Sequence, residues 1–322
     1  MAEWRQAEAA SESAALRAAA TAGETETGAA GEVSGAAELA ELRDRIERLF
    51  ADPPDAAEPE HYELLARFRG ALNGGEARAA EPDPASPWGW RVNRWVKQGL
   101  LLGFRLGRTV DLTVGTADGL RLRFRDKDTY PLRRLAPGSG VRVVPGGSAI
   151  RDGVYLGYGV TCVPPMYINA GAYVGDGSLV DSHALVGSCA QVGRRVHLSA
   201  AAQLGGVIEP VGALPVIVED DVLVGGNCGV YEGTVVQRGA VLGAGTILTR
   251  STPVYDLVRE TIHRAAEDGP LVIPAGAVVV PGSRAVGRGM GKEWGLSLYT
   301  PVIVKYRDAA TDERVQLEDW LR

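Results

Sequence analysis

The middle of this chain repeats a hydrophobic residue at every sixth position. The positions in step are Val144, Ile150, Leu156, Cys162, Ile168, Val174, Val180, Val186, Val192, Leu198 and Leu204. Two residues before most of them stands a small or slim side chain, and the residue after them is often glycine. Neither an α-helix nor an alternating strand repeats every six residues. A fixed short period is typical of a solenoid, in which each repeat buries its apolar face only by stacking on its neighbours.

Six residues suffice for one flat face and one corner, so three faces make a triangular coil of about eighteen residues. The hydrophobic residue points into the prism, and the small residue packs beside the corner. The same step resumes after two interruptions, at Val218, Val224, Val230, Val236, Leu242 and Leu248, and then at Ile273 and Val279. The interruptions, residues 205–215 and 251–270, should leave the coil at its corners as loops, where function concentrates.

The regions on either side of the coil differ from it in pattern. We divide the chain into a disordered tail over 1–35, a small α/β domain over 36–140, the coil over 141–285 and an extension over 286–322. The tail has almost no large apolar residue, so it cannot bury enough surface to offset its ordering entropy. The extension should contain a strand in LSLYTPVIVKY and a short helical tail that ends at Leu321.

The α/β domain should combine helices with short strands. Apolar residues at helical spacing predict helices over 39–50, 60–72 and the later part of 88–106. The polar, proline-containing residues 76–87 between them are expected to form a linker. Two short strands should follow, near Val110–Val114 and Leu120–Arg125, with a turn at Asp118-Gly119.

Composition excludes several classes of protein. The 322 residues carry a formal net charge of −6, which argues against a general nucleic-acid surface. No apolar run approaches the length of a membrane span, and the first residues lack the apolar region of a secretory signal. The three cysteines, Cys162, Cys189 and Cys228, have no CxxC spacing, so we expect reduced structural thiols and a cytoplasmic location. We therefore expect neither a nucleic acid nor a membrane as a partner.

One region is nevertheless basic. Residues 91–134 include Arg91, Arg94, Lys97, Arg105, Arg121, Arg123, Arg125, Arg133 and Arg134. A solvated face explains such a cluster, and so does a surface that attracts a small polyanionic molecule.

Several stretches carry sequence that is more specific than the hexads. They are RVVP at Arg142–Pro145, YINAGAYVGDGSLVDSHALVGSCAQVGRRVHLSAAAQLGGVIEP at Tyr167–Pro210, VYEG at Val230–Gly233, STPVYD at Ser251–Asp256, IPAGAVVV at Ile273–Val280 and SLYTPVIVK at Ser297–Lys305. Upstream of the coil, NRWVKQGLLLGFRL and FRDKDTYPLR belong to the same set. Together they resemble the tetrahydrodipicolinate N-succinyltransferase family, over about residues 88–322.

This resemblance implies a mainly β fold, a left-handed parallel β-helix, and a homotrimer with active sites between neighbouring prisms. It implies transfer of succinyl from succinyl-CoA to the amino group of ring-opened tetrahydrodipicolinate, in lysine and diaminopimelate synthesis. Succinyl-CoA is then a co-substrate, the second partner is a small dicarboxylate, and no cofactor or metal is held permanently.

The resemblance also assigns candidate residues. Attack of an amine on a thioester requires loss of a proton from the amine and a donor for the oxyanion. Asp181, in SLVDS, matches the family's aspartate and is the substrate-contact and base candidate; the alternative is that it only hydrogen-bonds a corner. Arg142 matches an arginine that binds one substrate carboxylate, a task for which a guanidinium fork is suited; the alternative is a surface arginine.

Other candidates border the first interruption. Gly205 and Gly206, with Ser199 upstream, are the candidate acyl-CoA-binding residues, because a backbone amide here can approach the thioester oxygen; a plain turn is the alternative. Glu209 is a candidate for orienting the amine, or it is a solvated loop carboxylate. A succinyl carboxylate would need one more cation, for which Arg194, Arg195 and Lys305 are candidates.

The sequence departs from the family in two places. Gly229 stands where the family often has a glutamate, although Glu232 of VYEG is kept. His183 stands where tryptophan is common. It lies two residues after Asp181, so both side chains can face the same side, and imidazole is a natural base near neutral pH. His183 is therefore a third catalytic candidate, or it fills a trimer contact; His197, in VHLS, is expected to be structural.

Three other functions are compatible with the coil. A related enzyme could transfer acetyl from acetyl-CoA. A γ-class carbonic anhydrase needs three histidines on zinc, and only His183 and His197 lie in the regular coils. A non-catalytic trimeric scaffold would have no substrate-shaped insertion, whereas this chain has one at 205–215.

Overall fold

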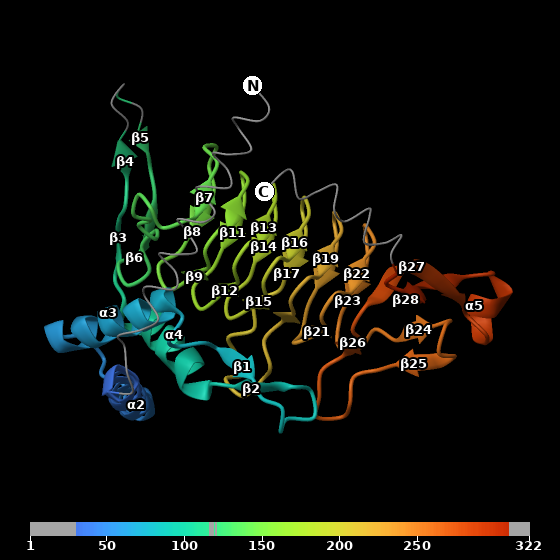
Figure 1. Cartoon of the computed structure of the whole chain (residues 1–322), viewed down its shortest axis with the longest axis horizontal. Coiled ribbons are helices and arrows are strands. Elements are labelled where there is room, and N and C mark those ends of the chain that lie inside the picture. Colours follow the sequence, from blue (N-terminus) through green and yellow to red (C-terminus); the bar gives the residue numbers. More distant parts are fainter. Residues whose placement is uncertain (1–29, 116–118, 120, 309–322) are drawn as a thin grey trace, which may run out of the picture. The chain divides into compact units, whose positions relative to one another are not determined.

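The computed structural model describes residues 30–115, 119 and 121–308, with side chains from residue 35 onward (Figure 1). The expectations for the first 29 residues and for the helical tail after residue 308 lie outside the described residues. The chain divides into two compact units, residues 1–45 and 46–322. The first contributes the start of helix α2 (Ala30–Ala51), which begins before the predicted helix over 39–50. All that follows concerns the second unit.

Two further helices lie where apolar spacing predicts them. Helix α3 (Pro59–Gly74) begins with proline in its first turn and with a capping box in which the Glu58 amide donates to His61 Nδ1 at 2.9 Å. It ends at Gly75, whose φ of 79° is the left-handed conformation that favours glycine at a helix end. Helix α4 (Arg94–Leu106) is amphipathic, and its apolar side is buried.

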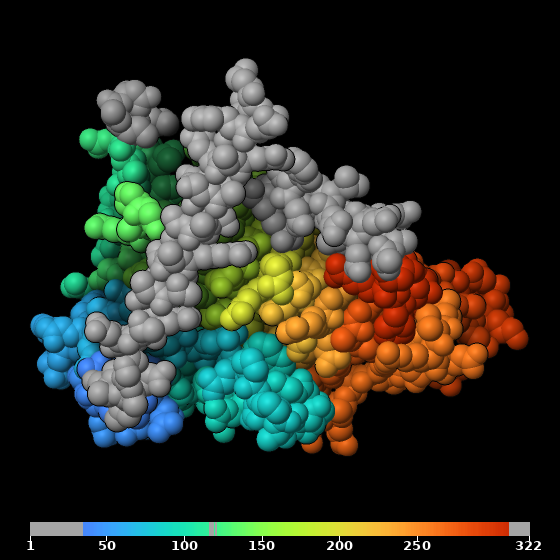
Figure 2. Space-filling model, in the orientation of Figure 1, coloured from blue at the N-terminus to red at the C-terminus, as the bar shows by residue number. Residues whose placement is uncertain are grey.

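Residues 76–87 are not a linker, so that prediction is wrong. They contain strand β1 (Ala80–Pro82), which pairs antiparallel with β2 (Trp90–Val92). Ala79 and Ala80 are fully buried, and Ala80 packs against Ile217 and Val235 of the coil. The space-filling view shows this cyan segment lying directly on the coil (Figure 2). Polar and proline residues suggested a linker, but the small side chains of Ala79 and Ala80 let the backbone approach the coil closely.

The predicted strands after α4 are confirmed as an antiparallel ribbon. Strand β3 (Thr109–Asp111) pairs with β6 (Arg125–Lys127), and β4 (Val114–Gly115) pairs with β5 (Arg121–Leu122). Asp118, of the predicted turn, lies outside the described residues. The basic cluster is not uniformly solvated, because Lys97 is fully buried.

The hexads form a parallel β-helix with three faces (Figure 1). The first face contains β7 (Arg142–Val143), β10 (Thr161–Cys162), β13 (Leu179–Val180), β16 (His197–Leu198), β19 (Leu223–Val224), β22 (Val241–Leu242) and β27 (Ala277–Ala285). The second contains β8 (Ala149–Ile150), β11 (Tyr167–Ile168), β14 (Leu185–Val186), β17 (Gln203–Leu204), β20 (Gly229–Val230) and β23 (Ile247–Leu248). The third contains β9 (Tyr155–Leu156), β12 (Tyr173–Val174), β15 (Gln191–Val192), β18 (Ile217–Val218), β21 (Val235–Val236) and β26 (Val272–Ile273).

The predicted inward positions are confirmed from Ile150 onward, and they form one continuous core. The first position is wrong by one residue. Cys162 pairs in register with Val143, not Val144, because the corner of the first coil holds an extra residue. Gly146 and Gly147 both have positive φ there, which lets the chain make the longer turn. The three cysteines are free and buried, in agreement with structural thiols.

Both interruptions leave the coil as insertions. The second contains the hairpin β24 (Val254–Asp256) and β25 (Thr261–His263), and β24 pairs parallel with β28 (Ser297–Tyr306). The predicted C-terminal strand is thus confirmed as β28, which also pairs along β27; the short helix α5 (Gly289–Glu293) lies between them. Among the described residues, no helix is both long enough and apolar enough to cross a membrane.

Candidate functional site

The two insertions leave the coil at the same corner, between the second and third faces. The first lies between β17 and β18 and the second between β23 and β26, so one tight corner, Tyr231–Gly233, separates them. The two insertions and the segment Trp88–Val92 line an open cleft of about 1510 Å³. Its described lining is Trp88, Trp90, Val92, Gly205, Gly206, Val207, Glu209, Pro210, Gly212, Ala213, Leu214, Tyr231, Glu232, Gly233, Thr249, Arg250, Ser251, Ala265, Ala266, Glu267, Asp268, Gly269 and Pro270.

A buried lysine of α4 holds the first insertion. Lys97 has no exposed surface, and its Nζ donates a hydrogen bond to the carbonyl of Ala213. Burial lowers the pKa of this lysine below its ordinary value, because the charged form loses its hydration. Helix α4 therefore anchors the 205–215 insertion through the hydrogen bond from Lys97 to Ala213.

A buried carboxylate holds the second insertion. Asp256 accepts hydrogen bonds from Tyr306 Oη at 2.6 Å, from the amides of Val258 and Arg259 at 3.0 and 2.9 Å, and contacts His263 Nε2 at 3.3 Å. Burial alone would raise the pKa of Asp256, but these hydrogen bonds outweigh it and lower the pKa to about 2. The network ties the β24–β25 hairpin to β28.

The N-terminal segment closes the third side of the cleft. Trp90 Nε1 donates to Glu219 Oε1 at 2.9 Å, and Trp88 packs on Gly269, where a Cβ would lie 2.6 Å from its ring. Nearby, Arg78 stacks 3.7 Å above the ring of Tyr173 on the third face. The indoles are therefore held by contacts with the coil and with the second insertion.

The charge of the cleft is mainly negative. Among the described lining residues, Glu209, Glu232, Glu267 and Asp268 face one cation, Arg250. The Arg250 guanidinium donates to the carbonyls of Ala266 and Glu267, and its amide donates to Glu232 Oε2 at 2.8 Å. A dicarboxylate would thus meet little positive charge from this chain's cleft alone.

Three of the predicted residues lie in this cleft: Gly205, Gly206 and Glu209. The Gly205 amide already donates to the Val230 carbonyl at 2.8 Å in the coil ladder. Gly206 is exposed, and within the described structure its amide has no backbone acceptor. Gly206 is therefore the better placed of the two to donate to a ligand. Glu209 is exposed at the rim.

Asp181, His183 and Ser199 lie at a different corner, between the first and second faces. Asp181 Oδ1 accepts from the amide of Ser182 at 2.7 Å, so one oxygen braces the corner. His183 is exposed, with φ of 62°, and its amide donates to the Pro165 carbonyl. Ser199 follows β16 as Asp181 follows β13, so the two residues stand one coil apart. This corner and the cleft both border the second face, on its opposite sides.

Arg142 belongs neither to the cleft nor to the corner that holds Asp181, His183 and Ser199. It lies on β7, the first strand of the first face, opposite Thr161, and is exposed. The structure therefore places the predicted residues in three groups on one chain.

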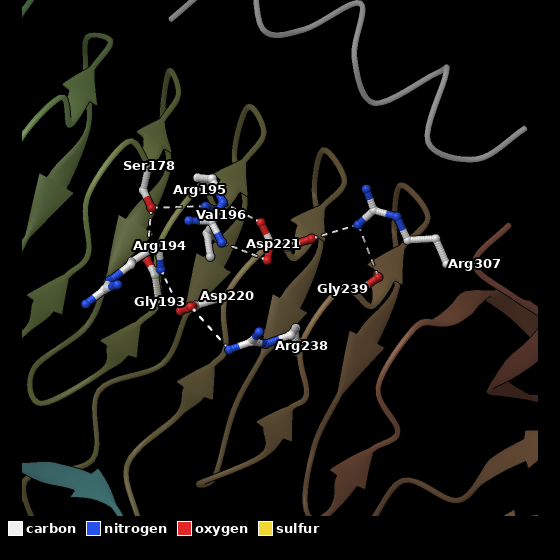
Figure 3. A network of polar contacts seen from close by, with 10 residues as sticks. All are labelled: Ser178, Gly193, Arg194, Arg195, Val196, Asp220, Asp221, Arg238, Gly239 and Arg307. Carbon is white, nitrogen blue, oxygen red and sulfur yellow. Dashed lines mark hydrogen bonds and ion pairs between the residues drawn. The ribbon is translucent and has the colours of Figure 1, made fainter. Parts of the chain in front are cut away.

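None of the three candidate cations is among the described lining residues of the cleft. Arg195 forms a two-pronged pair with Asp221 at 2.6 and 2.9 Å, at the corner between the third and first faces, and Lys305 Nζ lies 3.1 Å from Asp308. Arg194 uses its amide to bond Asp220, while its exposed side chain points away from that carboxylate (Figure 3). Of the three, Arg194 is the one whose guanidinium is available to a ligand.

Sequence reasoning missed Tyr231, Trp88 and Arg250 as cleft residues. Tyr231 was part of a motif that we noted, yet only its neighbour Glu232 was considered. Its position was a usable signal, because it begins the one tight corner between two insertions. The contact between Trp88 and Gly269 could not be predicted from the hexad pattern, because both residues lie outside the regular repeats. Among the described residues, no group of three His, Cys, Asp or Glu side chains is arranged to hold a metal ion.

Comparison with known proteins agrees with the hexads. Residues 41–106 match the family description "Tetrahydrodipicolinate N-succinyltransferase N-terminal", and residues 215–250 match "Hexapeptide repeat of succinyl-transferase". The chain is 38% identical over 274 residues to a 2,3,4,5-tetrahydropyridine-2,6-dicarboxylate N-succinyltransferase of Polynucleobacter asymbioticus, covering 84% of this chain and 92% of that protein. It is 39% identical over 272 residues to the protein of the same name from Aromatoleum aromaticum, again covering 84% and 92%.

A solved structure from Campylobacter jejuni, described as a 2,3,4,5-tetrahydropyridine-2-carboxylate N-succinyltransferase, is 16% identical. The alignment covers 79% of this chain and 64% of that one, with a TM-score of 0.44.

Proposed function

Because this chain belongs to the tetrahydrodipicolinate N-succinyltransferase family, we propose that it transfers a succinyl group from succinyl-CoA to the amino group of ring-opened tetrahydrodipicolinate. Its coil is the left-handed parallel β-helix of hexapeptide-repeat transferases. The observation that carries the proposal is the cleft between the two insertions, since its wall includes the family-specific GGVIEP stretch. A scaffold without a reaction would not need such a cleft.

The proposed reaction has two requirements that these residues can meet. The amine must lose a proton before or as it attacks the thioester carbon, and we assign this base to Asp181, with His183 as the alternative. The carbonyl oxygen gains negative charge in the tetrahedral intermediate, and the Gly206 amide is the donor that the geometry leaves free. When the C–S bond breaks, CoA leaves as the thiolate, takes up the proton that the base removed from the amine and is released as the thiol, and the amide product remains.

The other roles concern binding. Arg142 would pair with one substrate carboxylate, Glu209 would orient the amine, and Ser199 would contact the acyl-CoA arm. Arg194 is the candidate partner for the terminal carboxylate of the succinyl group, because Arg195 and Lys305 already pair with aspartates.

We further propose that the active protein is a homotrimer. Asp181 and Glu209 lie at opposite edges of the second face, and the cleft carries more carboxylates than cations. A second copy packed on this face would bring the base of one subunit, and its arginines, to the cleft of the other. A straight prism also has flat faces whose covering limits uncontrolled edge pairing.

A thiol-release assay tests the function directly. Free CoA thiol should appear with succinyl-CoA and the dicarboxylate acceptor together, and not with either alone. If thiol release from acetyl-CoA is as fast as from succinyl-CoA or faster, the proposal that succinyl-CoA is the acyl donor is wrong. Sedimentation at micromolar concentration should give three times the 34.0 kDa chain mass, and a monomer would contradict a site built from two subunits.

A further inference from the structure

One aromatic ring in the cleft occupies space that two glycines leave open. The ring of Tyr231 lies over Gly205 and Gly229. A Cβ at Gly205 would stand 2.8 Å from Tyr231 Cδ1, and a Cβ at Gly229 would stand 2.5 Å from its Cε2. Side chains essentially never approach that closely, so any larger residue at either position would displace the ring.

The backbone of Tyr231 is fixed as well. Its amide donates to the Leu248 carbonyl at 3.0 Å, and its carbonyl accepts from Thr234 Oγ1 at 2.7 Å. Neither glycine needs a positive φ here, since neither is among the left-handed residues. The close approach of the ring is therefore the reason that these positions hold glycine.

The hydroxyl of this ring has no assigned task. A Cβ at Gly229 would lie 2.9 Å from Tyr231 Oη, so the hydroxyl stands where a side chain of residue 229 would begin. Within the described part of the chain it has no hydrogen-bond partner, although the ring lines the cleft. A phenol offers one donor, which suits an anionic oxygen.

We propose that Tyr231 is a substrate-binding and specificity residue, whose hydroxyl donates a hydrogen bond to a carboxylate oxygen of the acyl-acceptor. This inference rests on the proposed function. The cleft lining includes the carboxylates Glu209, Glu232, Glu267 and Asp268, so a neutral phenol adds a hydrogen-bond donor for the dicarboxylate without adding negative charge.

The test is kinetic. Tyr231→Phe keeps the ring and removes the donor, so kcat/KM for the dicarboxylate should fall by about 10- to 100-fold, the usual worth of a hydrogen bond to a charged group. The KM for succinyl-CoA and the thermal unfolding temperature should not change. Tyr158→Phe is the matched control, because Tyr158 is 69% exposed at another corner.

A second set of variants isolates the ring. Gly229→Ala should displace the ring and lose acceptor binding, whereas Gly229→Ala added to Tyr231→Ala should cost nothing more. Additive losses would overturn the role of the glycines. Wild-type turnover with an unaffected Tyr231→Phe would overturn this inference alone, while absence of wild-type turnover would overturn the proposed substrate and this inference with it.

Discussion

Replacing Asp256 with asparagine should weaken the attachment of the second insertion by an amount that the structure sets. The carboxylate is fully buried and accepts from one phenol and two amides. These donors lower its pKa from the ordinary 3.8 to about 2. Each unit of pKa difference between folded and unfolded states is worth about 1.4 kcal/mol, so the ionised form contributes about 2.5 kcal/mol at pH 7.

The same difference fixes the pH dependence. Because the folded-state pKa lies below the unfolded value, the contribution is complete well above pH 4 and is lost as the pH falls through the folded pKa. At pH 3 about half of it, roughly 1.3 kcal/mol, should remain. The free energy of unfolding of Asp256→Asn should therefore approach that of the wild type in acid.

Urea unfolding of both proteins between pH 7 and pH 3 measures this gap. Asp308→Asn is the control, since Asp308 pairs with Lys305 at an exposed site and such pairs contribute less than about 1 kcal/mol. A gap between wild type and Asp256→Asn that is the same at both pH values would refute the assignment of the stabilisation to the ionised carboxylate. So would a gap no larger than that of the control.

Two further predictions concern activity. Asp181→Asn can still accept the hydrogen bond from the Ser182 amide at the corner, but it cannot take a proton. Turnover should therefore fall by roughly 10²–10⁴-fold with little change in succinyl-CoA binding. A large loss of turnover in His183→Phe with a small one in Asp181→Asn would instead assign the base to His183. Lys97→Met should leave thermal stability nearly unchanged, because an apolar side chain replaces a buried cation. Its turnover should nevertheless fall by about tenfold as the 205–215 loop loses its anchor; unchanged turnover would show that the loop is held by other contacts.

The coil was predictable because its signal is local and repeated. Each inward position is supported by many others, so an exception such as Met166, which stands where most repeats have a small residue two positions before the inward one, does not hide the period. The same strength explains the error at Val144. An unbroken step of six was extended one coil too far, whereas Gly146 and Gly147 lengthen the first corner by a residue.

The linker prediction failed for a different reason. Residues 76–87 read as polar and proline-containing, but what decides their structure is a surface far away in sequence. Ala79 and Ala80 are buried because the third face of the coil offers a flat apolar surface to a thin strand. The composition of a segment reports only its own apolar area. It does not show that a distant apolar surface lies against the segment, so that small side chains are enough to bury it.

The candidate site also contains residues that the sequence identified and residues that only the structure reveals. Family motifs named Asp181, Glu209 and Arg142, but a motif does not say that the coil carries Asp181 and Glu209 to different corners and Arg142 to a strand of the first face. The turn follows from the arithmetic of the coil, since residues a multiple of about eighteen apart share a corner and others do not. Tyr231 shows the reverse case: its role depends on two absent side chains, at Gly205 and Gly229, which look like ordinary turn glycines in sequence. Their meaning becomes visible only when a ring is seen in the space above both, and that space exists because the insertions leave the coil on either side of one tight corner.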